Sequence, residues 1–368
     1  MSELLVAEGI SARYRVDADE PPVRAVDDVS IVLHEGESLG IAGESGCGKS
    51  TLASVLSLNV HPPLTVTSGR LELAGHRLSL TEPGWRRQAE AMRGKVVALL
   101  PQGAMNVLNP TRRVSDFVYD VLQSHMPRIS RKEAVERAAE RFEQLALPRR
   151  ALDAYPHQLS GGMRQRVVAV VSTLLDPAVL IADEPTSALD VSSQRALLKL
   201  MAGLLERRII RGIVFITHEL ALLRAVTHRV AIMYAGQVVE VGPTEDVLFR
   251  SAHPYTKALM DATIVLETGT RRQRIETIGG APPSLMAPPP GCRFHPRCPV
   301  AMPVCSRETP PVVTVGAGRT AACWWVAERM QQAAAPAGAG AAGGAGPGAG
   351  AGEAEAVGEG HDTRAASQ

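Results

Sequence analysis

Short apolar runs alternate with longer amphipathic stretches through the first 250 residues of the chain. Five runs rich in branched apolar side chains are expected to form strands, at residues 38–42, 96–100, 179–182, 213–217 and 229–233. The last four are nearly continuous in apolar residues, as strands covered on both faces of a sheet should be. Residues 131–147 have helical spacing and lie between Ser130 and Pro148, which suit a helix start and a helix end. The alternation predicts an α/β fold, with a parallel or mixed sheet flanked by helices.

The texture of the sequence changes after residue 250. Proline and glycine become frequent, as in residues 279–283 and 288–291, and four of the five cysteines fall between 292 and 323. We interpret residues 251–330 as a small appended domain with little regular structure, following a main domain at 1–250. Residues 331–368 are mostly alanine and glycine, with a few proline and glutamate residues. Such a composition cannot bury a core, so we expect a disordered tail there.

Charge and composition argue against a nucleic-acid-binding protein and against a membrane-spanning one. The chain has 39 Lys and Arg residues against 38 Asp and Glu residues, which gives no support for a nucleic-acid-binding surface. No apolar run approaches the roughly 20 residues that span a bilayer, and residues 1–5 do not read as a signal peptide. We therefore expect a cytoplasmic chain, unless a membrane partner holds it at the inner face. In a reducing compartment the cysteines are not expected to form a disulfide framework.

A glycine-rich loop follows the first of these strands. Residues 43–51 read GESGCGKST and fit the G-x-x-x-x-G-K-[ST] pattern, whose backbone N–H groups and following helix start surround a phosphate. Lys49 is expected to reach the β- and γ-phosphates, and Ser50 to ligate Mg²⁺. A chance glycine turn is the alternative, but it is disfavoured by the strand before the loop and the helix after it. The expected nucleotide contacts of this loop are Gly43, Ser45, Gly46, Gly48, Lys49, Ser50 and Thr51.

Two carboxylates end the third expected strand. Asp183 and Glu184 follow the apolar run 179–182, and the carboxyl edge of a parallel sheet is where α/β folds bind ligands. Asp183 is expected to hold Mg²⁺, and Glu184 to act as general base on the attacking water. An ordinary acidic turn after a buried strand is the alternative, which the phosphate loop makes less attractive.

The most specific stretch of the chain is residues 159–166, LSGGMRQR. Ser160 is a good N-cap, and Gly161 and Gly162 permit close approach at the start of a helix. This is a second anion-binding helix start, about 110 residues after the first. One nucleotide does not easily need both from one subunit, so we expect this surface to complete the site of a second subunit. The stretch resembles the signature motif of ABC ATPases.

The resemblance covers residues 3 to about 250 and implies a P-loop NTPase core with a helical subdomain, acting as a dimer that buries two ATP molecules. It also implies roles for four further residues. Gln102 resembles the glutamine that senses Mg²⁺ and nucleotide, and Asp190 the aspartate that reaches across the dimer. His218 resembles the histidine that contacts the γ-phosphate, and Tyr14 the aromatic residue that stacks on adenine. Taken singly, each could instead be structural.

The region after residue 250 resembles the C-terminal extension of oligopeptide/dipeptide permease ATP-binding subunits. The resemblance rests on HPYT at 253–256, GGAPPSL at 279–285 and GCRFHPRCP at 291–299. It implies a peripheral ATPase at the cytoplasmic face of the membrane, energising uptake of di- or oligopeptides. The implied partners are a second ABC ATPase subunit, expected to be a paralogue, two transmembrane permease subunits and an extracytoplasmic solute-binding protein.

Other classes stay open as alternatives. Importers of nickel or another small solute share the extension. A soluble ABC ATPase unlinked to transport usually has two ATPase domains or a coiled-coil insertion, and an exporter subunit would lack the cysteine-rich lobe. His228 stands where the family usually has an acidic residue, which leaves the subgroup open.

Four cysteines of this extension are candidate metal ligands. Cys292, Cys298, Cys305 and Cys323 are separated by five, six and seventeen residues, unlike the C-x-x-C pairs of common zinc sites. A 4Fe–4S cluster, which the resemblance implies, a zinc ion and four free thiols are the three alternatives. Arg297, next to Cys298, is expected to favour the thiolate.

Overall fold

The structure is a computed structural model that describes residues 2–15, 17, 19–264 and 278–334. Its centre is an eight-stranded sheet in the order β11-β12-β10-β9-β3-β8-β7-β6. The five expected strands form its parallel part, as β3 (Ser38–Ala42), β6 (Val97–Leu100), β7 (Val179–Asp183), β8 (Gly212–Ile216) and β9 (Arg229–Tyr234). Each agrees with the prediction to within one residue at either end, which confirms the α/β class.

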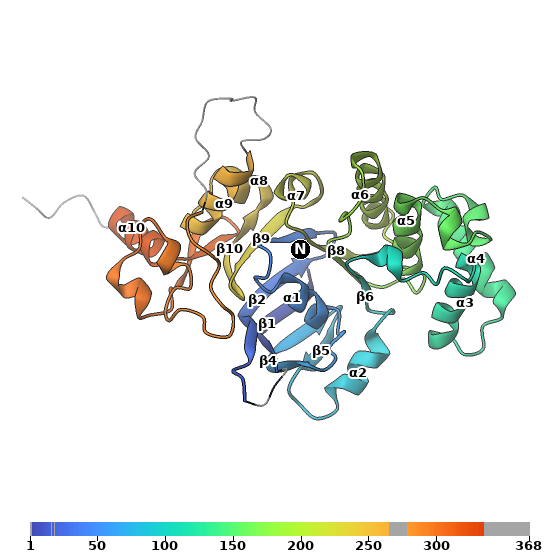
Figure 1. The fold of residues 1–368 in the computed structure, drawn as a ribbon, viewed down its shortest axis with the longest axis horizontal. Helices are drawn as coiled ribbons and strands as arrows, with labels where there is room; N and C mark the ends of the chain where they lie inside the picture. Colours follow the sequence, from blue (N-terminus) through green and yellow to red (C-terminus); the bar gives the residue numbers. More distant parts are fainter. Residues whose placement is uncertain (1, 16, 18, 265–277, 335–368) are drawn as a thin grey trace, which may run out of the picture.

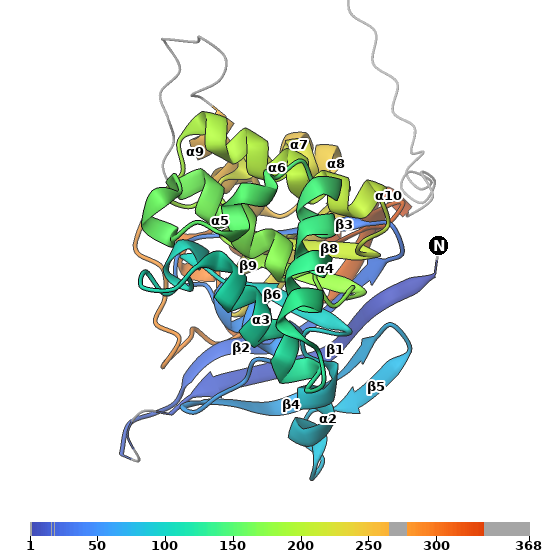
Figure 2. The same ribbon diagram turned by 90° about the vertical axis from the view of Figure 1, so that its right-hand side faces the viewer.

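A second sheet of four antiparallel strands lies beside the first (Figure 2). Its order is β2-β1-β4-β5, with β1 (Glu3–Tyr14), β2 (Val23–His34), β4 (Leu64–Leu73) and β5 (His76–Ser79). Its strands bury alternate side chains, and this apolar face shares one core with α1 (Lys49–Leu56) and the central sheet. The sheet therefore supports α1, and with it the loop that α1 follows.

The other face of the central sheet carries a group of helices, drawn to one side of the molecule in Figure 1. They are α3 (Val114–His125), α4 (Arg131–Gln144), α5 (Gly161–Val171) and α6 (Val191–Glu206), with short turns η1 (Ala104–Asn106), η2 (Arg149–Leu152) and η3 (Pro156–Gln158). Ser130 caps α4 as expected, because its Oγ accepts a hydrogen bond from the N–H of Glu133 at 3.2 Å. The helix ends before residue 147, since Ala146 adopts a left-handed φ of 56°.

Shorter helices complete the first 250 residues. These are α2 (Trp85–Met92), α7 (Leu220–Val226) and α8 (Thr244–Phe249), and β10 (Gln237–Pro243) precedes the last of them. Within the parts of the chain that the structure describes, no helix has both the length and the apolar character needed to cross a bilayer.

The region after residue 250 has more regular structure than the sequence led us to expect. It contains α9 (Pro254–Ile264), η4 (His295–Arg297), η5 (Pro303–Ser306), β11 (Val312–Gly316), β12 (Arg319–Ala322) and α10 (Trp324–Ala334). The strand β12 pairs antiparallel with β10 and so extends the central sheet. Helix α10 runs into the segment expected to be a tail, and residues 335–368 of that segment lie outside the described residues.

Buried polar contacts explain why this C-terminal region joins the sheet. The Glu240 carboxylate on β10 is fully buried and accepts hydrogen bonds from the backbone N–H groups of Ala252 and His253. Arg319 on β12 donates to the same carboxylate at 2.7 Å. A buried carboxylate needs such partners, so these contacts attach the C-terminal hairpin to the central sheet.

Candidate active site

The glycine-rich loop connects β3 to α1 at the carboxyl edge of the parallel strands. Gly43, Gly46 and Gly48 have φ angles of 152°, 78° and 106°. A Cβ atom on Gly48 would lie 1.9 Å from the Ala25 carbonyl oxygen, and one on Gly43 would lie 2.1 Å from that of Met233. Only glycine fits these two positions. Ser45 and Gly46 form the exposed tip of the loop.

Lys49 folds back across this loop. Its Nζ donates hydrogen bonds to the carbonyl oxygens of Gly43 at 2.8 Å and Glu44 at 2.9 Å. The ammonium group is buried and lies at the start of α1, where backbone N–H groups also favour an anion. The loop and Lys49 together provide the donors that a nucleotide phosphate requires.

Ser50 and Asp183 bring two oxygen ligands together beside the loop. The Ser50 hydroxyl donates to Asp183 Oδ1 at 3.1 Å. Burial raises the pKa of Asp183, and the hydrogen bond from Ser50 opposes this shift in part. A hydroxyl and a carboxylate are ligands that Mg²⁺ prefers, together with phosphate oxygens and water. The residues therefore fit the expected magnesium site.

Three side chains from the ends of β6, β7 and β8 meet next to Asp183. Glu184 Oε2 accepts a hydrogen bond from Gln102 Nε2 at 2.8 Å, and Glu184 Oε1 lies 3.0 Å from His218 Nδ1. The Glu184 side chain is 17% exposed, against 56% for His218. Gln102 contacts this carboxylate rather than the Ser50–Asp183 pair. The arrangement presents a carboxylate, held between an amide and an imidazole, to any group bound on the loop.

The SGG turn at 160–162 begins α5, which Figure 1 draws among the group of helices to one side of α1. Ser160 is exposed and caps α5, since its Oγ accepts from the N–H of Met163 at 3.2 Å. Gly162 packs against Ser193, because a Cβ on this glycine would lie 2.4 Å from Ser193 Oγ. The turn is thus held against the start of α6.

Asp190 caps α6 on the same exposed surface. Its Oδ1 accepts hydrogen bonds from the N–H groups of Ser192 and Ser193, both at 3.0 Å. The hydroxyl groups of the same two serines hold the pKa of this carboxyl well below its usual range. The start of α5 and the start of α6 therefore form one surface of exposed donors and a carboxylate.

Tyr14 lies at the end of β1, beside α1. Its hydroxyl is 3.2 Å from Thr51 Oγ1, and its side chain is half-buried. The residue thus reaches the helix that carries the phosphate loop, where adenine stacking was expected. Adenine stacking by Tyr14 stays a prediction.

The four cysteines of the C-terminal region do not form a metal-binding group in this structure. Among the described residues, no cluster of three His, Cys, Asp or Glu side chains is placed to hold a metal ion. Burial raises the pKa of Cys292 to about 11 and also raises those of Cys298 and Cys323. The neighbouring thiols Cys298, Cys305 and Cys323 add to the shift at Cys292. Because metal binding itself deprotonates a thiol, these values do not test the expected 4Fe–4S cluster, which stays a prediction.

Arg297 does not act on its neighbour Cys298 as expected. Its guanidinium group instead forms a bidentate ion pair with Glu44 of the phosphate loop. Sequence reasoning missed this contact because it joins residues 253 positions apart. The GCRFHPRCP stretch was the only signal, and it did not indicate where the arginine would bind.

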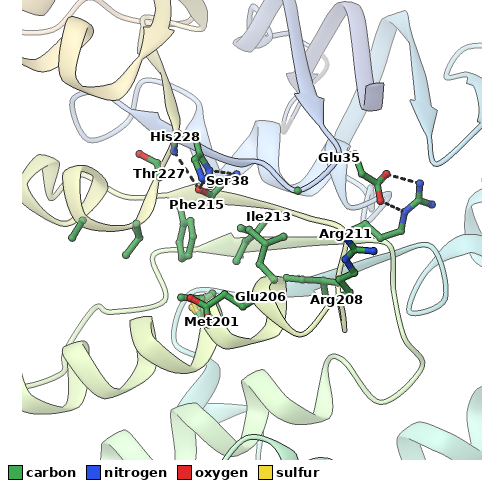
Figure 3. Close-up of a pocket in the computed structure, with 16 residues that line it drawn as sticks. Glu35, Ser38, Met201, Glu206, Arg208, Arg211, Ile213, Phe215, Thr227 and His228 are labelled. Carbon is green, nitrogen blue, oxygen red and sulfur yellow. Dashed lines mark hydrogen bonds and ion pairs between the residues drawn. The ribbon is translucent and has the colours of Figure 1, made fainter. Parts of the chain in front are cut away.

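The cavity drawn in Figure 3 lies at the opposite edge of the sheet from the phosphate loop. It has a volume of about 630 Å³, and Glu35, Arg211, Ser38 and His228 are among the residues that line it. His228 Nδ1 accepts a hydrogen bond from the Ser38 N–H at 3.0 Å, which joins the first residue of β3 to the residue before β9. His228 therefore has a structural contact here, remote from the candidate chemistry.

Comparisons with known families match two parts of the chain. Residues 26–187 match the family described as "ABC transporter", and residues 239–305 match "Oligopeptide/dipeptide transporter, C-terminal region". The first match contains the phosphate loop, Gln102, the SGG turn and the two carboxylates. The second contains most of the cysteine-rich region.

Two relatives match more than four fifths of the chain. The "Dipeptide transport ATP-binding protein DppD" of Caldanaerobacter subterraneus subsp. tengcongensis is 37% identical over 325 residues, which covers 88% of this chain and 97% of that protein. The "Probable peptide ABC transporter ATP-binding protein y4tR" of Sinorhizobium fredii is 40% identical over 310 residues, covering 83% of this chain and 90% of that protein.

A solved structure shares the fold. The dimeric, post-hydrolysis structure of the ATP-binding cassette MJ0796 with ADP and Pi superimposes with a TM-score of 0.56 at 23% identity. The match covers 66% of this chain and 99% of the cassette. At this identity the likeness shows the fold alone.

Proposed function

The chain belongs to the ABC transporter family, in the group that carries the oligopeptide/dipeptide C-terminal region, and from this we propose that it binds and hydrolyses ATP to drive the import of dipeptides or oligopeptides. The observation that supports the chemistry is the convergence of Gln102, Glu184 and His218 beside a loop that holds Lys49. Relatives named for peptide or dipeptide transport support the solute class.

The reaction is the transfer of the γ-phosphoryl group of ATP to water. Lys49 and the loop N–H groups bind the β- and γ-phosphates, and Glu184 orients the attacking water and accepts its proton. The bond from the γ-phosphorus to the bridging oxygen breaks as the new P–O bond forms, which leaves ADP and phosphate. Mg²⁺, when bound by Ser50 and Asp183, neutralises charge on the phosphates. Gln102 and His218 orient the Glu184 carboxylate toward the attacking water.

A second subunit supplies the other wall of the site. Ser160, Gly161, Gly162 and Asp190 lie at the starts of α5 and α6, and Figure 1 draws these two helices apart from α1, which follows this chain's own phosphate loop. In a face-to-face pair, this surface covers the ATP that the partner's loop binds, and Tyr14 stacks on the adenine. ATP thus favours the closed pair, and this differential affinity drives the conformational change.

The assembly we propose contains a paralogous ATPase subunit, two membrane permeases and an extracytoplasmic solute-binding protein. In it the chain is a peripheral subunit at the cytoplasmic face. The exposed Val107 lies in the segment after Gln102, where contact with a permease is expected from the family resemblance.

Glu184→Gln in the assembled transporter tests the proposed chemistry. We expect ATP turnover to fall on the order of 10²- to 10⁴-fold, because an amide cannot accept the proton of water. Binding of a fluorescent ATP analogue should persist. Glu35→Gln is the matched control, since Glu35 lies at the opposite edge of the sheet in a pair with Arg211. Unchanged hydrolysis in the Glu184 variant would show that another group is the base.

Uptake of a labelled dipeptide into vesicles loaded with ATP tests the solute class.

A further inference from the structure

Residues of the C-terminal region bind Glu44, the second residue of the phosphate loop, through hydrogen bonds. The backbone N–H of Glu44 donates to the Tyr255 hydroxyl at 3.0 Å. Its carboxylate receives two hydrogen bonds from Arg297, at 2.8 Å and 2.9 Å. Its carbonyl oxygen accepts from Lys49 Nζ at 2.9 Å. Every polar group of this loop residue is therefore bound, two of them by residues beyond position 250.

Arg297 is itself fixed in place by its surroundings. Its side chain is only 7% exposed. The Nε group donates to the carbonyl oxygen of Gly279 at 2.8 Å, and one Nη group also donates to the Tyr234 hydroxyl at 3.2 Å. The guanidinium group lies 5.7 Å from the centre of the Tyr234 ring. A bidentate pair with so little solvent and so many partners is rigid.

A second contact from the same region acts on the middle of the loop through an intermediate residue. Arg293 donates to the carbonyl oxygen of Ala235 and to the carboxylate of Asp27. The neighbouring Gly236 N–H donates to the Cys47 carbonyl oxygen at 2.8 Å. Arg297 therefore contacts the loop directly at Glu44, whereas Arg293 acts indirectly, by fixing the residue before Gly236, which binds Cys47.

Aromatic packing connects the two contacts. Tyr234, Tyr255 and Phe294 form a buried cluster with ring centres 4.5 Å to 5.3 Å apart. Phe294 follows Arg293 directly and lies in the turn before Arg297. A movement of this turn would therefore displace both arginines and the rings beneath the loop.

We propose that Arg297 is a positioning residue for ATP binding, acting through Glu44, so that the C-terminal region is a structural part of the nucleotide site. The inference rests on the function proposed above. A loop that presents its N–H groups correctly only part of the time binds ATP more weakly, by the reciprocal of that fraction. The pair also neutralises the Glu44 carboxylate, which would otherwise repel the phosphates.

The test measures ATP affinity and turnover separately. For Arg297→Met in the assembled transporter, we expect the KM for ATP to rise about tenfold, because ATP must now order the loop. At saturating ATP, kcat should stay within about twofold, since the occupied loop is complete again. Arg297→Lys retains charge and packing but gives only single-donor contacts, and we expect a smaller rise in KM. If Arg297→Met does not fold, the KM of Arg297→Lys still tests the proposal.

Two further variants separate positioning from general stability. Arg211→Met removes another bidentate arginine–glutamate pair, at the opposite edge of the sheet, and should leave the KM unchanged. In Glu44→Gln/Arg297→Met no unpaired carboxylate remains beside the phosphates, so we expect a lower KM than in Arg297→Met alone. A KM within about twofold of wild type for Arg297→Met, whatever its melting temperature, would overturn the proposal.

ATP hydrolysis by the wild-type assembly tests the proposed function separately from the role of Arg297. If the wild-type assembly does not hydrolyse ATP, the proposed function fails. Binding of a fluorescent ATP analogue to the full-length chain still tests Arg297 in that case, with weaker binding by the variant as the supporting result and equal binding as the opposing one. If the wild type is active and the variant binds and hydrolyses ATP as the wild type does, only the present inference fails.

Discussion

Glu184 carries the candidate chemistry on a backbone conformation that few residues other than glycine adopt. Its φ angle is 44°, and its N–H donates to the carbonyl oxygen of Ile216 at 2.8 Å. Left-handed backbone at a non-glycine residue costs on the order of 1–3 kcal/mol and collects at functional sites. The neighbouring strand β8 therefore holds the chain in the turn that directs the carboxylate toward Gln102 and His218.

His253 gives a prediction about stability and pH. It is 1% exposed, and burial lowers its pKa to about 4, against about 6.5 in an unfolded chain. As pH falls between these values, the unfolded chain binds a proton that the folded chain does not. The stability that this group contributes is therefore complete above pH 6.5 and is lost toward pH 4, by about 3 kcal/mol in full.

His253→Asn tests this prediction by urea unfolding at pH 7.5 and pH 5. Asparagine can replace the ring nitrogen that accepts from the Tyr255 N–H at 3.0 Å, but it does not titrate. We expect the free energy of unfolding to fall less with pH in the variant than in the wild type. His61→Asn, at an exposed position, should keep the wild-type pH dependence. Equal pH dependence in all three proteins would contradict the assignment.

At the scale of the element, the parallel strands could be predicted and the antiparallel ones could not. Strands such as β7 and β8 bury every residue, so their sequences are continuous apolar runs. In β1 the buried and exposed residues alternate, and register shifts interrupt the alternation. In β11 no residue is buried, so its sequence carries no hydrophobic signal. Its place depends on pairing with β12, which is a tertiary contact.

The serine caps of two helices give a matched pair for a second prediction. Ser130 and Ser160 are both exposed, and each accepts from a backbone N–H at 3.2 Å. Replacement of either by alanine should cost about 1 kcal/mol of stability, measured by urea unfolding. In the assembled transporter only Ser160→Ala should lose ATPase activity, on the order of 10²-fold, if its helix start stabilises the reacting phosphate. Equal activity of the two variants would argue that the SGG turn is only a helix cap.

At the scale of the whole molecule, the candidate site follows from strand order, while its C-terminal support does not. Gln102, Asp183 and His218 each follow a predicted parallel strand, so the sequence places them at one edge of the sheet. The contact between Arg297 and Glu44 has no such local origin, because it depends on β12 joining β10 and on the turn around Phe294. Motifs identified the C-terminal region, but only the structure relates it to the loop.

Division of the site between two subunits leads to the last prediction. In one chain, the start of α1 and the start of α5 lie on different parts of the molecule (Figure 1). If the site is shared as we propose, a lone chain has the phosphate loop and Glu184, but no partner places the start of its α5 over the γ-phosphate. Because removal of such donors costs on the order of 10²-fold in rate, the assembled transporter should hydrolyse ATP faster per subunit by at least that factor. Both preparations should bind a fluorescent ATP analogue, which controls for folding. A chain shown to be monomeric by light scattering, yet hydrolysing ATP at the assembled rate, would mean that each subunit contains a complete site.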